Sequence, residues 1–445
     1  MKSYVHHRMI FLVVVFSAVV TPAQQSTPYR LSLQEAIAKG LQANLAVLVA
    51  DTRVEEAEGT RMRRLSSALL PHVRGQSYAS FQNRNLRAFG ISFPGVPEVA
   101  GPFSNYDFRV YADQNVLDVQ SYRNWKASER AVEAGKMDYQ DARDLIIRSI
   151  ASLYLNTQAA AARVEAAQSR VNTSNVLFKL ANDKHDAGTA TGVDVVRARV
   201  QLANDQQVLL VQQNQYKQGL LALARNLGLS PRTPLELAES LNYKPLTTPQ
   251  FDTLLTSALQ ARPDYLSLET QRKGLVEQQG ASRARYFPKL SVNGNYGALG
   301  RSVGSTQGTG VIQGQLDVTL FDRDRNGEAQ ELASRVKRVD DQIADLRRGI
   351  EEEIQAALLN LESASDQVAV AKEGQDLARR ELELAQDRFQ SGVANNVEVA
   401  TAQDALARAQ ENYILAVSSH IDAKFALARA AGGTQKNIGQ YLENP

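Results

Sequence analysis

The feature that most constrains this chain is an internal repeat at a fixed spacing of 204 residues. The segment Ala181–Gly188 (ANDKHDAG) matches Ala385–Gly392 (AQDRFQSG) without a gap, and an Ala-Leu-Ala-Arg motif ends at Arg225 and again at Arg429. About 15 of 48 aligned positions are identical, against roughly 4 expected for an alanine-rich pair. We therefore expect two copies of one structural unit.

The repeat also extends toward the N-terminus, with one insertion. Asp118 pairs with Asp322 at the same spacing, whereas Pro71 pairs with Pro288 at a spacing of 217. The first copy therefore has about 13 additional residues between its proline and its aspartate, as expected for a surface loop. The stretch 89–102, which is rich in glycine and proline, is the predicted insertion.

Each copy is expected to contain two strands, because apolar and polar residues alternate there. The strands are predicted at about 72–83, 106–117, 289–299 and 311–321, and the last two are joined by a loop at 300–310. Runs of about ten residues with one apolar and one polar face are typical of transmembrane barrels. A soluble two-sheet domain is the alternative. Four strands alone could not bury such faces, so we expect strands to be pooled between chains.

Four long helices are predicted at about 122–187, 193–227, 326–391 and 397–431. In the third, Ile350, Ile354, Ala357 and Leu361 recur at steps of three and four, and such a mean spacing of 3.5 indicates a coiled-coil seam. From about residue 124 to 186 the first helix would be about 95 Å long at 1.5 Å per residue, which no compact domain requires. Glycine-containing turns separate the helices of each pair, so each copy should end in an antiparallel helical hairpin.

The composition excludes several classes of function. The chain has no cysteine, which excludes disulfides and thiolate chemistry, and its 50 basic and 48 acidic residues give no electrostatic footprint for nucleic acid. The five histidines are scattered, and we find no metal-ligand spacing, catalytic triad or phosphate-binding glycine loop. We therefore expect no enzyme activity, no cofactor and no bound metal.

The repeat divides the chain into five segments. Residues 1–23 are predicted to be a secretory signal peptide, because basic residues precede an apolar run that is too short to span a bilayer. A weak membrane anchor is the alternative. The first repeat then covers 24–228, an equatorial linker 229–262, the second repeat 263–432 and a C-terminal tail 433–445.

This organisation resembles the TolC family of outer-membrane efflux proteins over essentially the whole mature chain. The resemblance rests on the prolines that precede the strands, on Leu320-Phe321-Asp322 after the last strand and on the two glycine-centred turns. It implies a mainly α fold with β, in which a homotrimer forms a twelve-stranded β-barrel continuous with an α-helical barrel. It also implies a passive exit duct in the outer membrane, with a long periplasmic extension, for a tripartite efflux or type I secretion system.

The resemblance further implies partners and roles for residues near the turns. The partners would be outer-membrane lipid, an inner-membrane transporter and a periplasmic adaptor (membrane fusion) protein. The turn residues expected to contact the adaptor are Gly188, Thr189, Gly392 and Val393. Asp194, Glu398 and Phe389 are expected at the periplasmic aperture.

Two interpretations of the carboxylates remain open at this point. Asp194 and Glu398 begin the two returning helices, where a carboxylate stabilises the helix N-terminus by about 0.3–1 kcal/mol. In a trimer the same residues would place six carboxylates around one axis. Phe389, Ala394 and Thr401 stand at positions of the family's polar lock, so we expect the entrance to be held by packing more than by salt bridges.

The second functional hypothesis is a periplasmic coiled-coil adaptor or scaffold, since adaptors also use long antiparallel hairpins. Adaptors normally have one such hairpin between lipoyl-like β domains, whereas this chain has two hairpins, each preceded by a strand pair. The duct is therefore the preferred interpretation. Drugs, metal ions, siderophores and proteins are all compatible cargoes.

Overall fold

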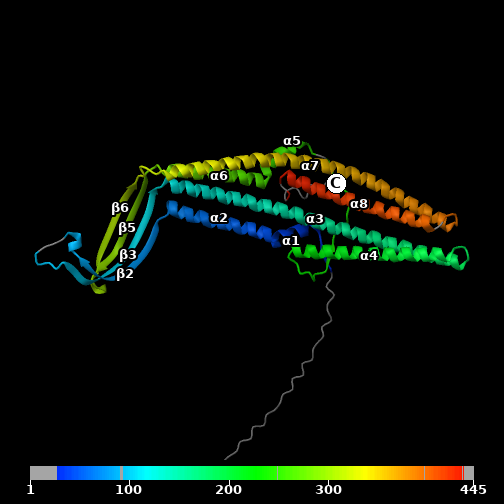
Figure 1. The fold of residues 1–445 in the computed structure, drawn as a ribbon, viewed down its shortest axis with the longest axis horizontal. Helices are drawn as coiled ribbons and strands as arrows, with labels where there is room; N and C mark the ends of the chain where they lie inside the picture. The colour runs from blue at the N-terminus through cyan, green and yellow to red at the C-terminus, as the bar shows by residue number, and fades with distance from the viewer. Residues whose placement is uncertain (1–27, 91–93, 248, 395, 433, 435–445) are drawn as a thin grey trace, which may run out of the picture.

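The computed structural model describes residues 28–90, 94–247, 249–394, 396–432 and 434. The predicted signal peptide and, apart from Thr434, the predicted tail lie outside the described residues. The described chain is elongated, with a four-stranded sheet at one end and two helical turns at the other (Figure 1).

The order of elements is the same in both repeats. The first comprises α1 (Leu33–Ala43), α2 (Leu45–Leu69), β2 (His72–Asn85), β3 (Val99–Leu117), α3 (Val119–Asp186) and α4 (Gly192–Asn226). The second comprises α5 (Phe251–Ala261), α6 (Pro263–Ala284), β5 (Lys289–Gly300), β6 (Gln307–Asp317), α7 (Asp324–Gln390) and α8 (Asn396–Ala430). Two short strands, β1 (Tyr29–Leu31) and β4 (Leu235–Leu237), pair in parallel.

Helix α5 is the counterpart of α1, although it lies in the segment that the sequence suggested as a linker. Both helices have 11 residues, and each is followed almost directly by a longer helix. The second repeat therefore begins at α5 rather than at residue 263, and the linker is correspondingly shorter.

The main sheet has the antiparallel order β2-β3-β5-β6, so the two hairpins meet along β3 and β5. The alternation read from the sequence gives the sheet two different faces. Exposed apolar side chains on one face include Phe81, Phe108, Tyr296, Ile312 and Leu316. The residues that alternate with them are mostly polar, among them Gln76, Arg109, Asn295 and Gln315.

Strand β6 departs from the prediction. The strand expected over 311–321 runs instead from Gln307 to Asp317, and the predicted hairpin loop is accordingly shorter. The reason lies in its neighbour: β5 begins at Lys289, which is opposite Asp317. Residues 318–321 therefore have no strand to pair with among the described residues of the same chain, although Leu320 and Phe321 continue as exposed apolar side chains.

The long helices start and end close to the predicted positions. Helix α3 has 68 residues and begins slightly earlier than expected, because Asp118 caps it by accepting a hydrogen bond of 2.9 Å from the Ser121 N–H. At 1.5 Å per residue α3 is about 100 Å long. The predicted seam of α7 is buried at Ile350, Ile354, Ala357, Leu361, Ala364 and Val368.

The helices lie side by side in a fixed order. Near the sheet α6 packs between α3 and α7, and near the turns α8 takes that place, while α2 and α4 pack on the other side of α3 (Figure 1). None of the helices in the described ranges is both long enough and apolar enough to cross a membrane.

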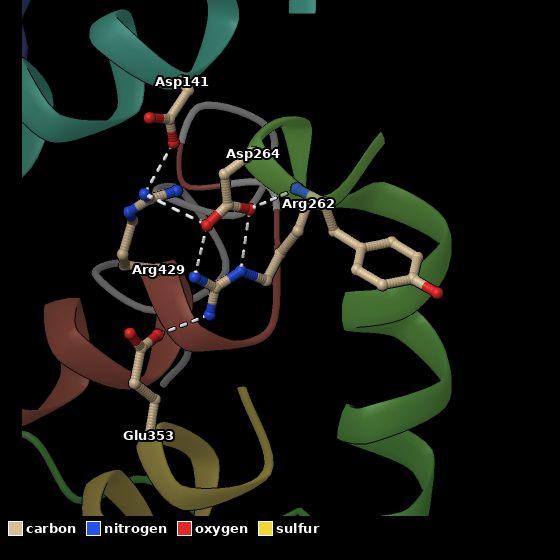
Figure 2. Close-up of polar contacts among 6 residues, drawn as sticks. Asp141, Arg262, Asp264, Glu353 and Arg429 are labelled. Atoms are coloured by element: carbon tan, nitrogen blue, oxygen red, sulfur yellow. Dashed lines mark hydrogen bonds and ion pairs between the residues drawn. The ribbon is translucent and has the colours of Figure 1, made fainter. Parts of the chain in front are cut away.

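A buried ionic cluster ties the middle of the molecule together (Figure 2). Arg262, at the junction of α5 and α6, is 2 % exposed and contacts Asp264 at 2.6 Å and Glu353 of α7 at 2.5 Å. Arg429 of α8 contacts Asp141 of α3 at 2.6 Å. The cluster therefore joins α3, α6, α7 and α8 at one level of the bundle.

Candidate functional site

The candidate site is the end of the molecule formed by the two helical turns. Gly188 and Gly392 both have positive φ, at 72° and 75°, a conformation that favours glycine. In each turn the following residue donates a backbone hydrogen bond to the last helical turn: Thr189 to Lys184 O at 2.8 Å, and Val393 to Arg388 O at 2.9 Å. The two turns therefore have the same local geometry.

Asp194 caps the start of α4. Its carboxylate accepts hydrogen bonds from the Thr191 hydroxyl at 2.6 Å and from the Thr191 N–H at 3.1 Å. These hydrogen bonds, the side-chain one first, lower the pKa of Asp194 below its usual value. The residue therefore keeps its negative charge well into the acidic range.

Glu398 holds the equivalent place at the start of α8 and has a different partner. Its Oε1 lies 2.9 Å from Nε of Arg388, at the end of α7, so an ion pair spans the second turn. Both side chains are about half exposed, at 54 % for Arg388 and 43 % for Glu398. The charge at Glu398 is therefore partly balanced by Arg388, and the carboxylate of Asp194 is held by Thr191.

Lys184 occupies the position of Arg388 in the first repeat but reaches across to the second hairpin. Its ammonium group donates to the backbone oxygens of Phe389 and Gln390, the latter at 3.3 Å. It also lies 4.5 Å from the centre of the Phe389 ring. Lys184 thus joins the end of α3 to the end of α7, and the two turns are held together within one chain.

Phe389 lies inside the bundle in the single chain. The side chain is only 6 % exposed and packs in a cluster with Leu177, Leu382, Val399 and other apolar residues. It fixes the two hairpins to each other, and its place at the periplasmic aperture stays a prediction. Packing thus accounts for part of the contact at this end, but the Arg388–Glu398 pair and Lys184 add polar contacts that the sequence interpretation did not include.

Arg388 and Lys184 are therefore the residues that sequence reasoning missed. The signal was present, since a basic residue occurs at both positions of the repeat. The spacing could not reveal that one side chain would pair within its hairpin and the other across hairpins. Among the described residues, no group of three or more acidic or histidine side chains could hold a metal ion.

Comparisons with known proteins identify the family. The outer membrane efflux protein family matches residues 36–229 and 254–433, which is most of the chain. The probable efflux pump outer membrane protein TtgC of Pseudomonas putida is 25% identical over 345 residues, which cover 74% of this chain and 68% of that protein. The pyoverdine export outer membrane protein OpmQ of the same species is 24% identical, with 89% and 84% covered.

Solved structures show the same fold. The CmeC outer membrane channel of Campylobacter jejuni superposes with a TM-score of 0.77 at 18% identity, covering 92% of this chain and 89% of that one. The outer membrane protein VceC of Vibrio cholerae gives 0.76 at 18% identity, covering 90% and 96%. These likenesses confirm the TolC-like fold, and the match to the family sets aside the adaptor hypothesis. The chain belongs to the outer membrane efflux protein family, whose members are exit channels of the outer membrane with a periplasmic helical extension, and not enzymes.

Proposed function

We propose that three copies of this chain assemble into one duct that receives substrate from an inner-membrane pump through a periplasmic adaptor. The sheet supports the assembly, because its outer strands, β2 and β6, each have one edge that pairs with no other strand among the described residues. Unpaired edges and an exposed apolar face are unfavourable in an isolated sheet. Pooling the strands of three copies would pair the edges and leave the apolar face toward lipid.

The proposed transfer of substrate from the adaptor is supported mainly by the two helical turns, which have matching geometry. Gly188 and Gly392 lie at the end of the molecule remote from the sheet, and their turns have the same hydrogen bonds (Figure 1). A trimer would present six such turns in a ring. We infer that the adaptor docks on this ring, with Thr189 and Val393 among its contacts; Val393 is an exposed apolar side chain.

The ring would also place the carboxylates of Asp194 and Glu398 at the entrance. Both residues have a local role as well, Asp194 as a helix cap and Glu398 as the partner of Arg388. We propose that they nevertheless form a cation-attracting constriction, because carboxylates brought together in a narrow opening concentrate cations. The Arg388 pairing reduces the contribution of Glu398 to this constriction.

In this proposal the inner-membrane pump, and not the duct, selects the cargo. The relatives include outer membrane proteins named for toluene efflux, antibiotic efflux and pyoverdine export, which are chemically unlike cargoes. Similarity to all of them supports a duct of low chemical selectivity in a small-molecule efflux system. Selection would then occur at the inner membrane.

Substitution of the turn glycines tests whether the adaptor docks on the turns and passes substrate to the duct. Gly188→Val and Gly392→Val should lower export while trimers still assemble, because a β-branched residue is strained at positive φ. Gly327→Val is the matched control, since Gly327 lies in open space on α7 without positive φ. Normal export by both turn variants in cells that need this duct would overturn the assignment of the turns.

A further inference from the structure

A segment between the two repeats, residues 238–247, follows β4 and contains neither helix nor strand; we call it the strap. Its first end is anchored to the first repeat by Glu239. The carboxylate of Glu239 accepts hydrogen bonds from the Leu33 N–H, at 3.2 Å, and from the Tyr154 hydroxyl. The backbone oxygen of Glu239 accepts another from Gln158 at 2.9 Å. The strap therefore begins on α1 and α3.

The second end of the strap lies on the second repeat. The hydroxyl of Tyr243 forms a hydrogen bond of 3.1 Å with that of Ser365 on α7, and Lys424 of α8 donates to the backbone oxygen of Lys244. Leu241 and Tyr243 also pack in an apolar cluster with residues of α7 and α8. These residues are Val368, Ala371, Tyr413, Ala416, Val417 and Ile421. The strap therefore ties the α7–α8 hairpin to the first repeat.

His420 of α8 lies beside this second anchor. Its ring is 4.8 Å from that of Tyr243, edge to face, and the residue is only 1 % exposed. Its Nδ1 is buried and has no hydrogen-bond partner among the described residues. The imidazole is therefore placed where its neutral form fits and a charged form would lack acceptors.

The charges around His420 are positive. Lys424 follows one turn later on α8 and is itself only 5 % exposed, and Lys244 of the strap acts on Lys424 with a charge of the same sign. The strap, α8 and α7 also contribute hydroxyl groups, those of Tyr243, Tyr413 and Ser365. Burial, and then the charge of Lys424, lower the pKa of His420 to about 4.

The first repeat has a different residue at this position. The counterpart of His420 at the spacing of 204 is Tyr216 of α4, which contacts the backbone of Leu237, just before the strap. Burial raises the pKa of Tyr216 above its usual value, so this residue stays neutral in acid. Both repeats thus use this position to hold the segment that joins them, but the second uses a histidine.

We propose that protonation of His420 releases the strap from α7 and α8, so that acid loosens the tie between the two repeats. With the strap in place, an imidazolium would face the ammonium group of Lys424 without an acceptor. Release of the strap admits water, which solvates the imidazolium and separates Lys244 from Lys424. The switch is local, because it breaks the contacts of one strap end and leaves the long helices in place.

The direction and size of the response follow from proton binding. With the strap in place the pKa of His420 is about 4, whereas a solvated histidine has the ordinary value of about 6.5. The released form therefore binds more protons between these values, and a fall in pH favours it. A fall through both values should shift the ratio of released to held strap by up to about 300-fold toward release.

A spin label on the strap tests the release in the purified, folded protein. The chain has no cysteine, so Asn242→Cys, at an exposed strap position, allows labelling at a single site. The label should be held at neutral pH and should gain a mobile component as the pH falls toward 4, while circular dichroism shows unchanged helix content. Val176→Cys, on an exposed position of α3, is the control label and should keep its mobility throughout.

Two further variants separate the titrating group from the anchor. His420→Gln cannot gain the charge, so the mobility of the label at position 242 should not depend on pH, whatever its starting level. Ser365→Ala removes the hydrogen bond to Tyr243 and leaves His420 in place. In that variant the mobile component should be larger at every pH and should appear at a higher pH than in the wild type.

Each result supports or overturns the strap release. A mobile component that grows with acid in the wild type and is independent of pH in His420→Gln supports it. A label that stays held down to pH 4 overturns it, and so does mobility that Ser365→Ala leaves unchanged. An equal acid response in His420→Gln would assign the titration to Glu239 at the first anchor instead. Loss of helix content together with the gain in mobility would show general unfolding and would contradict a local switch.

Discussion

Arg388 and Glu398 form an ion pair of 2.9 Å across the second helical turn. The pair balances one of the two carboxylates that we place at the entrance of the duct. Replacing Arg388 by alanine should therefore raise cation selectivity, because a positive charge beside Glu398 is removed. The measurement is the reversal potential across a planar bilayer with a salt gradient. Arg380→Ala, an exposed position further back on α7, is the control, and an unchanged reversal potential for Arg388→Ala would count against the entrance role of Glu398.

Arg429 and Arg225 are equivalent in the repeat but differ in environment. Arg429 is buried against Asp141 at 2.6 Å, whereas Arg225 is exposed. Arg429→Ala leaves the partly buried carboxylate of Asp141 without its partner and should lower the free energy of unfolding by about 1–3 kcal/mol. Arg225→Ala should change it by less than about 0.5 kcal/mol. Thermal unfolding followed by circular dichroism compares the two, and equal effects would show that the ionic cluster contributes no net stability.

His420 gives the bundle a defined pH dependence. It is buried, with its ring against Tyr243 at 4.8 Å between ring centres, and burial together with the charge of Lys424 lowers its pKa to about 4. An unfolded chain, with a histidine pKa of about 6.5, binds more protons than the folded chain between these values. The free energy of unfolding should therefore fall as pH drops from 6.5 to 4, by up to about 3 kcal/mol.

His420→Gln should remove this part of the pH dependence, as measured by chemical unfolding at a series of pH values. The same slope between pH 6.5 and 4 in the wild type and in His420→Gln would contradict the assignment.

The sheet edges allow a register to be predicted between copies. Within the chain, Tyr111 of β3 lies opposite Asn295 of β5. Their counterparts at the repeat spacings of 204 and 217 are Gln315 of β6 and Tyr78 of β2, which would face each other across the joint between two copies. The chain has no cysteine, so Tyr78→Cys with Gln315→Cys should give disulfide-linked trimers under oxidising conditions. Ala79→Cys with Gln315→Cys places the thiols on opposite faces of the sheet and should give no disulfide-linked trimers. Efficient linking of the Ala79→Cys and Gln315→Cys pair would show that the strands of two copies pair in a different register.

Pairing in this register would also explain the short β6. Val318, Thr319 and Leu320 continue the alternation of apolar and polar residues. In the proposed trimer β2 of another copy would be their neighbour, and the alternation would then reflect the assembly rather than the single chain.

The sequence predicted the fold because its periodicities are long. Alternation at period two and seams at period 3.5 recur along the chain, so the helices α3, α4, α7 and α8 could be placed within a few positions. The strands were placed less closely: β3 begins seven residues earlier than predicted, at Val99, and β6 is shifted by four residues. The roles of individual side chains were less accessible. His185 and Phe389 occupy the same repeat position, yet one is exposed and the other is buried against the neighbouring hairpin. Only the packing of the two repeats against each other separates them.

The most direct test of the account is the current carried by the purified protein in planar bilayers. We expect stable unitary steps, cation selectivity and block by trivalent cations that weakens as added salt screens the entrance. Asp194→Ala with Glu398→Ala should reduce the selectivity and the block while the trimer stays intact. Trimeric protein that gives no unitary steps would contradict the duct itself. Steps with unchanged selectivity and block in the double variant would show that Asp194 and Glu398 serve only their helices.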